Sequence, residues 1–218
     1  MPVAVDGRRR LAPEERKRLL LTHAVEVFSR RGIGRGGHTD IAELGGVSVA
    51  TVFNYFKTRD SLVISVLDEI ARFMLAMAEE AFTAEATPLA RIRDYFQRFL
   101  QACEEQPDYI KVWLEWSASP REVVWPRYLT LQSELLQQLS TQIEAAIRQG
   151  ELEQGLAATE RARWLWGNSQ MLTGMMFDPQ GKPDDIHRIV DQALDHLLRV
   201  KHQRTEKTAR PATAAMTA

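Results

Sequence analysis

Hydrophobic residues recur along most of this chain at intervals of three and four positions, the spacing that gathers them on one face of an α-helix. In the first such stretch, one row contains Leu20, Ala24, Val27 and Phe28. The residues Pro13–Glu15 before them combine a proline with two acids, which is typical of a first helical turn. No stretch shows the alternation of apolar and polar residues that a half-buried strand requires. The pattern predicts an all-α fold.

Glycines, prolines and capping residues divide the chain into about nine predicted helices. They run from Pro13 to Gly32, Thr39 to Leu44, Val49 to Phe56, Arg59 to Ala84, Thr87 to Glu105, Gln106 to Ala118, Trp125 to Gly150, Thr159 to Phe177 and Pro183 to Gln203. Thr39 and Ser48 are the expected N-caps of the two short helices. The last residues hold few large apolar side chains, which predicts a disordered tail.

Two short predicted helices joined by Gly45 and Gly46 give residues 39–56 the pattern of a helix-turn-helix. Small apolar residues are available to pack the pair together, namely Ile41, Ala42, Leu44 and Val47. The helical spacing directs four residues of the second helix toward the core, Val49, Val52, Phe53 and Phe56. It leaves four polar residues facing outward, Ser48, Thr51, Asn54 and Tyr55. Hydroxyl groups donate to phosphates and an amide reads a base edge, although an ordinary helical hairpin has the same pattern.

Basic residues gather in the first quarter of the chain. Residues 1–59 hold 11 Lys or Arg against 6 Asp or Glu, a net charge of +5, whereas the remainder holds 17 against 23, a net charge of −6. A basic segment on an acidic body indicates a polyanionic partner. The arginines Arg8, Arg9 and Arg10 are placed to form an arm that enters a minor groove beside the helix-turn-helix. A run of charges by itself is also typical of a solvated surface.

Other motifs give no catalytic prediction. The segment Gly32–Gly37 reads G-x-G-x-x-G, but a helix precedes it and no strand–helix–strand unit follows, which argues against a dinucleotide site. His38 comes next and is expected to meet a phosphate or to lie in solvent. The five histidines and the single cysteine show no metal-ligand spacing. We expect no enzymatic activity, no metal and no cofactor.

A helix, then a helix-turn-helix ending in Phe53-Asn54-Tyr55-Phe56, then a helical body resembles the TetR family of bacterial transcriptional regulators. Within that family, FSRRGIGRGGH at residues 28–38 and VSVATVFNYF at residues 47–56 closely resemble the LuxR/HapR/SmcR type, the master regulators of quorum sensing. A second stretch, KVWLEWSAS at residues 111–119 followed by Trp125-Pro126, resembles the same type. The resemblance implies an arm over residues 1–12, a DNA-binding domain over 13–58 and a regulatory and dimerisation domain over 59–203, and the composition places the disordered tail over 204–218.

The resemblance also implies a homodimer that binds double-stranded DNA at pseudo-palindromic operators. Each subunit would place residues 48–55 in a major groove, with half-sites about 34–36 Å apart or a multiple of that. By position, Arg8 and Arg10 match the arm arginines and Asn54 matches the base-reading asparagine. The expected DNA-binding residues are Arg8, Arg10, Thr39, Ser48, Thr51, Asn54, Tyr55 and Lys57. The last two helices would form the dimer interface through Leu194, Leu197 and Leu198, unless that stripe packs within one subunit.

An effector cavity in the helical body is a further implication of the resemblance. The residues that match its lining are Met74, Trp113, Tyr128, Gln132, Leu136 and Ser169. Such a mixture suits a small, mostly apolar ligand, although Trp and Met at helical spacing are also typical of a filled core. The LuxR type commonly has cysteine at Ser169 and a polar residue at Leu136, so a closely similar or thiol-dependent ligand mode is in doubt. Cys103 is expected to be a buried apolar residue.

Two other functions are compatible with the sequence. One is an all-α small-molecule carrier or enzyme without specific DNA binding, against which the charge asymmetry and the arginine arm argue. The other is a nonspecific architectural DNA binder, against which Asn54 and the two-fold geometry argue. The chain shows no signal-peptide segment and no apolar run of the ~18 residues that a membrane span needs. A cytoplasmic protein is therefore expected.

Overall fold

The structure, a computed structural model, describes residues 12–180 and 183–198. Over these residues it contains nine α-helices and no β-strand, which confirms the predicted all-α class. The helices are α1 (Pro13–Arg31), α2 (His38–Gly45), α3 (Val49–Tyr55), α4 (Arg59–Thr83), α5 (Pro88–Glu105), α6 (Pro107–Ser117), α7 (Trp125–Arg148), α8 (Ala158–Met176) and α9 (Pro183–Leu198). The predicted arm with Arg8 and Arg10, the predicted end of the last helix at Gln203 and the predicted tail lie outside the described residues.

Proline and hydroxyl side chains start several helices where the sequence predicted. Pro13, Pro88 and Pro107 occupy first helical turns, where the missing N–H would have had no intrahelical acceptor. The Ser61 N–H donates to the hydroxyl oxygen of Thr58 at 3.0 Å and so caps α4. These local signals explain why the observed helix ends lie close to the predicted ones.

The start of α2 corrects the prediction that Thr39 is the N-cap. The helix begins one residue earlier, at His38, and Gly37 is its N-cap. The Gly37 N–H donates to Oδ2 of Asp40 at 3.0 Å, because Asp40 occupies the third helical position, from which a carboxylate reaches back to the cap. Thr39 therefore lies inside the first turn, and its side chain is exposed.

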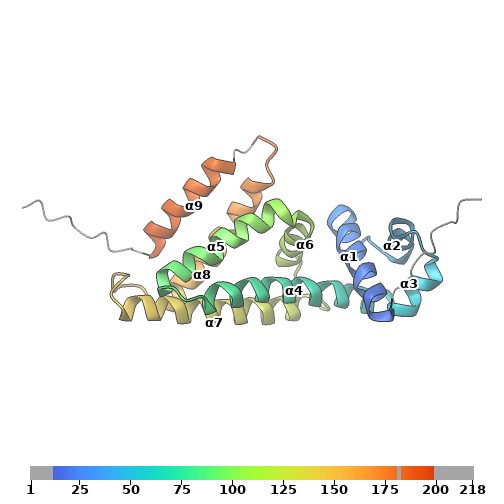
Figure 1. Cartoon of the computed structure of the whole chain (residues 1–218), viewed down its shortest axis with the longest axis horizontal. Helices are drawn as coiled ribbons and strands as arrows, with labels where there is room; N and C mark the ends of the chain where they lie inside the picture. Colours follow the sequence, from blue (N-terminus) through green and yellow to red (C-terminus); the bar gives the residue numbers. More distant parts are fainter. Residues whose placement is uncertain (1–11, 181–182, 199–218) are drawn as a thin grey trace, which may run out of the picture.

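The helices form two parts, a head made of α1, α2 and α3 and a body made of α4 to α9. Figure 1 shows the head at one end of the molecule, with α4 leaving it to run along the body beside α7. In the body, α5 packs against α4, α7 and α9, and α8 packs against α7 and α9. One core of buried apolar side chains extends through both parts. This arrangement presents α2 and α3 at the far end of the molecule from α9 (Figure 1).

The head is attached to the body along α1, which contacts both α4 and α6. The row of Leu20, Ala24 and Phe28 that the hydrophobic pattern predicted is buried. At the end of α1, the hydroxyl of Ser29 donates to Oδ1 of Asp108 on α6 at 2.6 Å. Apolar packing and polar contacts with α6 therefore fix the head, in addition to its covalent connection to α4.

Candidate nucleic-acid interface and ligand cavity

A tight turn between α2 and α3 completes the helix-turn-helix. Gly46 follows α2 with a φ of 61°, a left-handed conformation that glycine adopts without strain. The Val47 N–H donates to the carbonyl oxygen of Ala42 at 3.0 Å and closes the turn. Ile41 and Ala42 are buried as expected. Leu44 is not, being 37% exposed, because it borders an open groove between α1 and α2.

Only a narrow row of α3 faces the core. Val52 and Phe56 are buried as predicted, but Val49 and Phe53 are 37% and 44% exposed, which corrects the expectation that both point inward. The helix has seven residues and so makes about two turns. Val52 is the one residue within those turns that is buried, so the apolar pair Val49 and Phe53 is left at the surface.

The predicted DNA-binding residues that the structure describes lie on α2, on α3 and directly beside α3. Those with exposed side chains are Thr39, Ser48, Asn54 and Lys57. Thr51 and Tyr55 are half-buried. The backbone N–H of Thr51 donates to Oγ of Ser48 at 3.2 Å, which caps α3, and the two hydroxyls lie 2.9 Å apart. Tyr55 packs against the core. Arg8 and Arg10 lie outside the described residues.

His38 is buried, which corrects the expectation that it meets a phosphate or lies in solvent. It is 7% exposed, and its ring lies parallel to that of Phe53, with 3.9 Å between the centroids and 4° between the planes. Its Nε2 lies 2.7 Å from the carbonyl oxygen of Phe56. A carbonyl can only accept, so Nε2 carries the proton and donates it. The ring is covered because the first turn of α2 packs against α3.

Two charged side chains from the body hold the glycine-rich segment between α1 and α2. The Ile33 N–H lies 3.0 and 3.1 Å from the two carboxylate oxygens of Glu115 on α6. Nη2 of Arg59, at the start of α4, donates to the carbonyl oxygens of Ile33 at 2.9 Å and Gly36 at 3.2 Å. Local patterns in the sequence predict neither contact, because the partners are 82, 26 and 23 residues apart. The segment joins two helices, so it does not form a dinucleotide-binding turn.

The geometry of this segment requires glycine at two positions. Gly32 ends α1 with a φ of 85°, which lies in the region that favours glycine. A Cβ at Gly36 would lie 2.7 Å from Cδ1 of Phe28, closer than two carbon atoms can approach without displacement. The glycines therefore allow the segment to pass directly over the end of α1.

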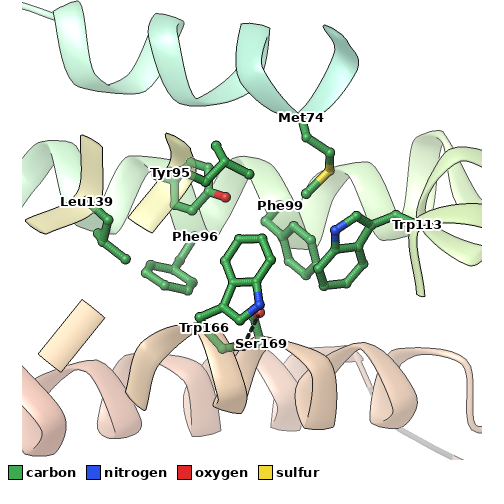
Figure 2. A pocket seen from close by; sticks show the side chains of 9 residues that line it. Met74, Tyr95, Phe96, Phe99, Trp113, Leu139, Trp166 and Ser169 are labelled. Atoms are coloured by element: carbon green, nitrogen blue, oxygen red, sulfur yellow. Dashed lines mark hydrogen bonds between the residues drawn. The ribbon is translucent and has the colours of Figure 1, made fainter. Parts of the chain in front are cut away.

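A small cavity lies in the body among α4, α5, α6, α7 and α8 (Figure 2). Its volume is about 10 Å³, which is about enough for one water molecule. The lining consists of Met74, Tyr95, Phe96, Phe99, Trp113, Leu135, Leu139, Trp166 and Ser169. The ring of Trp113 packs edge-on against Phe99 and Trp166, with centroids 5.5 and 5.8 Å apart. The interior is therefore nearly filled by aromatic side chains.

Of the six residues predicted to line a ligand cavity, Met74, Trp113 and Ser169 line this small cavity. Tyr128 is buried behind the lining residue Trp166, whose Nε1–H donates to the Tyr128 hydroxyl at 3.2 Å. Burial raises the pKa of Tyr128 above its ordinary value, so the phenol stays neutral and accepts this hydrogen bond.

Gln132 and Leu136 do not line the cavity, which corrects their assignment to it. Leu136 borders a separate groove between α7 and α8. The reason is the rotation of α7 about its axis, which presents Leu135 and Leu139 to the cavity and turns the neighbouring position outward. The aromatic lining residues from α5 and α8 were missed because their helical spacing is equally typical of core packing.

One polar group in the cavity wall has no partner. Nε1 of Trp113 is buried and makes no hydrogen bond with any described residue. Two other polar groups of the wall are paired: the Ser169 hydroxyl donates to the carbonyl oxygen of Trp166 at 2.7 Å, and Nε1–H of Trp166 donates to the Tyr128 hydroxyl. A buried donor without an acceptor costs free energy, so the site favours an occupant that supplies one.

The leucine stripe predicted for a dimer interface packs within one subunit. Leu194 and Leu198 are 2% and 0% exposed, and Leu197 is partly buried. Their helix, α9, packs against α5 and α8. Arg93 of α5 forms ion pairs with Asp191 and Asp195 of α9, which hold the stripe inward. This is the alternative that the sequence left open, and it corrects the role assigned to Leu194 and Leu198.

The exposed apolar surface of the last two helices lies on α8 instead. Trp164 and Met171 are 61% and 56% exposed. Gly167 lies between these two residues and Gly174 follows them. A Cβ added at either glycine would meet no atom within 4 Å. The four residues recur at intervals of three and four, so they share one face of α8. We call this surface the α8 face.

Burial raises the pKa of the Cys103 thiol to about 12, and the neighbouring Glu104 adds to the effect. The thiol is therefore protonated at neutral pH and is not a nucleophile. Among residues 12–180 and 183–198, no group of three His, Cys, Asp or Glu side chains is placed to hold a metal ion. In the same part of the chain, no helix combines the length and the hydropathy needed to span a membrane.

Residues 20–66 match the sequence profile of the bacterial regulatory proteins of the tetR family. The chain is 44% identical to the HTH-type transcriptional regulator LuxR of Vibrio harveyi over 128 residues, which cover 59% of this chain and 62% of LuxR. It is 33% identical to the HTH-type transcriptional regulator RutR of Escherichia coli strain K12 over 105 residues, 48% of this chain and 49% of RutR. The chain thus spans less than two thirds of the length of either relative.

A solved structure extends the likeness to nearly all of the chain. The TetR-family transcriptional regulator from Agrobacterium tumefaciens superposes with a TM-score of 0.75 and covers 88% of this chain and 100% of that chain. The sequence identity is 19%, so this likeness shows a shared fold. The proteins named in these comparisons are transcriptional regulators rather than enzymes.

Proposed function

We propose that the chain is a tetR-family regulator of the LuxR type, because residues 20–66 match the family profile and 128 residues are 44% identical to LuxR. In this role it regulates transcription by binding specific DNA sequences through α2 and α3. The observation that carries the proposal is the exposed amide of Asn54 on α3, a helix capped by Ser48 and anchored by Val52. An asparagine presented in this way reads adenine in the major groove. A regulator of bacterial DNA acts in the cytoplasm.

The remaining polar residues of the head would position the protein on the duplex. The hydroxyls of Thr39, Ser48 and Thr51 and the charge of Lys57 suit phosphate contacts, which fix orientation without reading sequence. Arg8 and Arg10 would enter the adjacent minor groove from the N-terminal arm. The exposed ring of Phe53 adds an apolar surface beside Asn54, suited to a thymine methyl group.

We propose further that two copies of the chain form a dimer through the α8 face together with the exposed side of α9. The exposed Trp164 and Met171 supply apolar area, and Gly167 and Gly174 leave room for a partner helix to approach. Such a two-fold contact turns two heads toward a pseudo-palindromic operator. The half-sites would lie about 34–36 Å apart, or a multiple of that.

The cavity between α5 and α8 is proposed to accept a small, mostly apolar effector. The unpaired Nε1–H of Trp113 calls for a hydrogen-bond acceptor on the ligand, and the cavity must widen to admit it. The helix α6 carries both Trp113 at the cavity and Glu115 at the head. A shift of α6 would therefore change the spacing of the two α3 helices and the DNA affinity.

The effector proposal can be tested with a ketone and a hydrocarbon of equal size. Cyclohexanone is expected to raise the melting temperature of the wild-type chain more than methylcyclohexane does. The difference should disappear in Trp113→Phe, which lacks the donor. An equal effect of the two compounds on the wild type would contradict the role of the indole N–H.

The LuxR-type resemblance also supports control of genes in response to cell density. Density would act through the amount of the protein, and any ligand would adjust its affinity for DNA. Transcript profiles of a strain with and without the protein, taken at low and high density, test this point. Loss of density-dependent transcription would support it, and unchanged profiles would refute it.

DNA binding is tested by fluorescence anisotropy with the full-length chain. The probes are the tightest-binding duplex selected from a randomised pool and a scrambled duplex of the same composition, each at several salt concentrations. Asn54→Ala should cost about 1–3 kcal/mol on the selected duplex and little on the scrambled one. Gln137→Ala, an exposed amide on α7, is the matched control and should change neither. No preference of the wild type for the selected duplex would refute sequence-specific binding.

A further inference from the structure

The helix α3 is too short to hold its own direction. It has seven residues, and helices of this length are not stable in isolation. Within the helix only Val52 is buried. Its N-terminal end is capped by Ser48, whose hydroxyl accepts the Thr51 N–H. The orientation of its C-terminal half therefore depends on packing against other elements, to which Tyr55 and Phe56 contribute.

His38 adds two directional contacts from the first turn of α2. One face of its imidazole covers the ring of Phe53, with the two planes 4° apart. Its Nε2–H donates to the carbonyl oxygen of Phe56, the residue that ends α3. The last carbonyls of a helix have no intrahelical donor, so this bond satisfies a group that would otherwise be unpaired. Two independent contacts thus tie α3 to α2 through one side chain.

Phe53 directly precedes Asn54, so a shift of the Phe53 ring moves the amide proposed to read the operator. Recognition through a side-chain amide requires the donor and acceptor to be held within about 0.5 Å of their productive positions. His38 is 7% exposed and so is not available to touch a base itself. Its effect on recognition must pass through Phe53 and Phe56.

We propose that His38 is a positioning residue that sets the orientation of α3 and thereby the operator selectivity of the protein. This inference rests on the proposed function, sequence-specific DNA binding through Asn54. It predicts that loss of the imidazole affects the selected duplex and leaves the sequence-independent attraction of the basic residues unchanged.

A double-mutant cycle with the full-length chain tests the inference. The affinities of wild type, His38→Ala, Asn54→Ala and the double variant are measured for the selected duplex and for the scrambled duplex at one salt concentration. His38→Ala should weaken binding to the selected duplex by roughly tenfold and binding to the scrambled duplex by less than about twofold. Asn54→Ala should have little further effect in the His38→Ala background, because a misplaced amide has already lost its contact.

Two conservative variants separate the ring contact with Phe53 from the hydrogen bond to Phe56. They also keep the inference testable if His38→Ala does not fold. His38→Phe keeps a stacked ring without the donor, and His38→Gln keeps a donor without the ring. Each should recover part of the selectivity that His38→Ala loses, and the cycle is run with His38→Gln if His38→Ala does not fold. In ¹⁵N-labelled wild type, the His38 Nε2–H signal should be protected from exchange, and it should be absent in every variant at this position.

The outcomes are distinguishable. The positioning role is supported if the losses of affinity for the selected duplex are non-additive and either conservative variant recovers part of the selectivity. Additive losses, or an unchanged selectivity ratio in a folded His38→Ala, would overturn it while the proposed function stands. A wild type that binds the selected and scrambled duplexes equally would overturn the proposed function, and the inference with it.

Discussion

The backbone N–H of Ile33 points at the carboxylate of Glu115 and lies 3.0 and 3.1 Å from its two oxygens, so a side chain of the body holds the first residues after α1. The guanidinium of Arg59 binds the carbonyl of the same residue. Both polar groups of the Ile33 backbone are thereby paired with charged side chains, and such hydrogen bonds are stronger than neutral ones. Side chains of α4 and α6 therefore hold the connection between α1 and α2, and its glycines allow the path that it takes.

Replacing Glu115 is expected to destabilise the protein. Glu115→Ala leaves the Ile33 N–H without its acceptor and should lower the free energy of unfolding by about 1–3 kcal/mol. Glu115→Gln keeps one acceptor oxygen and should lower it less. Urea denaturation of the full-length variants measures both, with Glu134→Gln, an exposed carboxylate on α7, as the control. Equal stability of Glu115→Ala and wild type would show that solvent replaces the carboxylate without cost.

Two glycines of the same segment should respond differently to alanine. In Gly36→Ala the added Cβ would meet Cδ1 of Phe28 at 2.7 Å, and we expect a loss of about 1–3 kcal/mol. In Gly34→Ala it would meet the end of the Arg121 side chain at 3.1 Å. That guanidinium is free to move aside, so little loss is expected. Thermal unfolding of the two variants compares their stability. Similar melting temperatures would argue against the close packing of Gly36 on Phe28.

Stability is expected to fall as the pH rises above about 9, in part because of Cys103. Burial raises the pKa of its thiol from 9.0 to about 12, so the thiol is neutral in both states below pH 9. Above that pH the thiol ionises first in the unfolded chain, which favours unfolding progressively until the folded pKa is passed. Urea denaturation between about pH 8 and about pH 10 should show a decline in wild type that is shallower in Cys103→Ala. Parallel pH profiles would mean that the thiol titrates alike in both states.

The α8 face should control self-association. Trp164→Glu places a charge at the centre of the proposed interface and should raise the dimer dissociation constant by about 30-fold or more. Leu129→Glu, on an apolar residue of α7 that is 43% exposed, is the control and should leave association unchanged. Sedimentation equilibrium measures both variants. A Trp164→Glu protein that remains as dimeric as wild type would place the interface elsewhere.

Local signals in the sequence were sufficient to predict approximately where helices begin and end. They were insufficient to predict which face of a helix is buried. Pro13 and Pro107 start helices because a proline fits a first turn whatever surrounds it. Phe53 was predicted to face the core because its spacing relative to Val52 and Phe56 permits it. Which side of a two-turn helix meets the core depends on how α2 and the rest of the head lie against it, and this is a tertiary property.

Among the residues of the candidate site, those whose surroundings depend on nearby positions could be predicted, and those with distant partners could not. Ser48 and Asn54 could be assigned because capping and exposure follow from positions within a few residues. Glu115 could not, because its partner is 82 residues away and a glutamate on a helix is most often solvated. The cavity lining was misassigned at Leu136 because a difference of one position on α7 decides between the cavity and the outer groove.

The small buried share of α3 has a consequence for the history of such proteins. Val52 is the one buried residue of this helix, and its exposed residues Val49, Ala50 and Asn54 contribute little to the core of the head. Substitutions there can exchange one target sequence for another while the chain still folds, provided that the cap and the contacts with α2 persist. Under the proposed function, a gene duplicated from this one would therefore acquire a new set of target promoters in a few mutational steps, without passing through an unfolded ancestor.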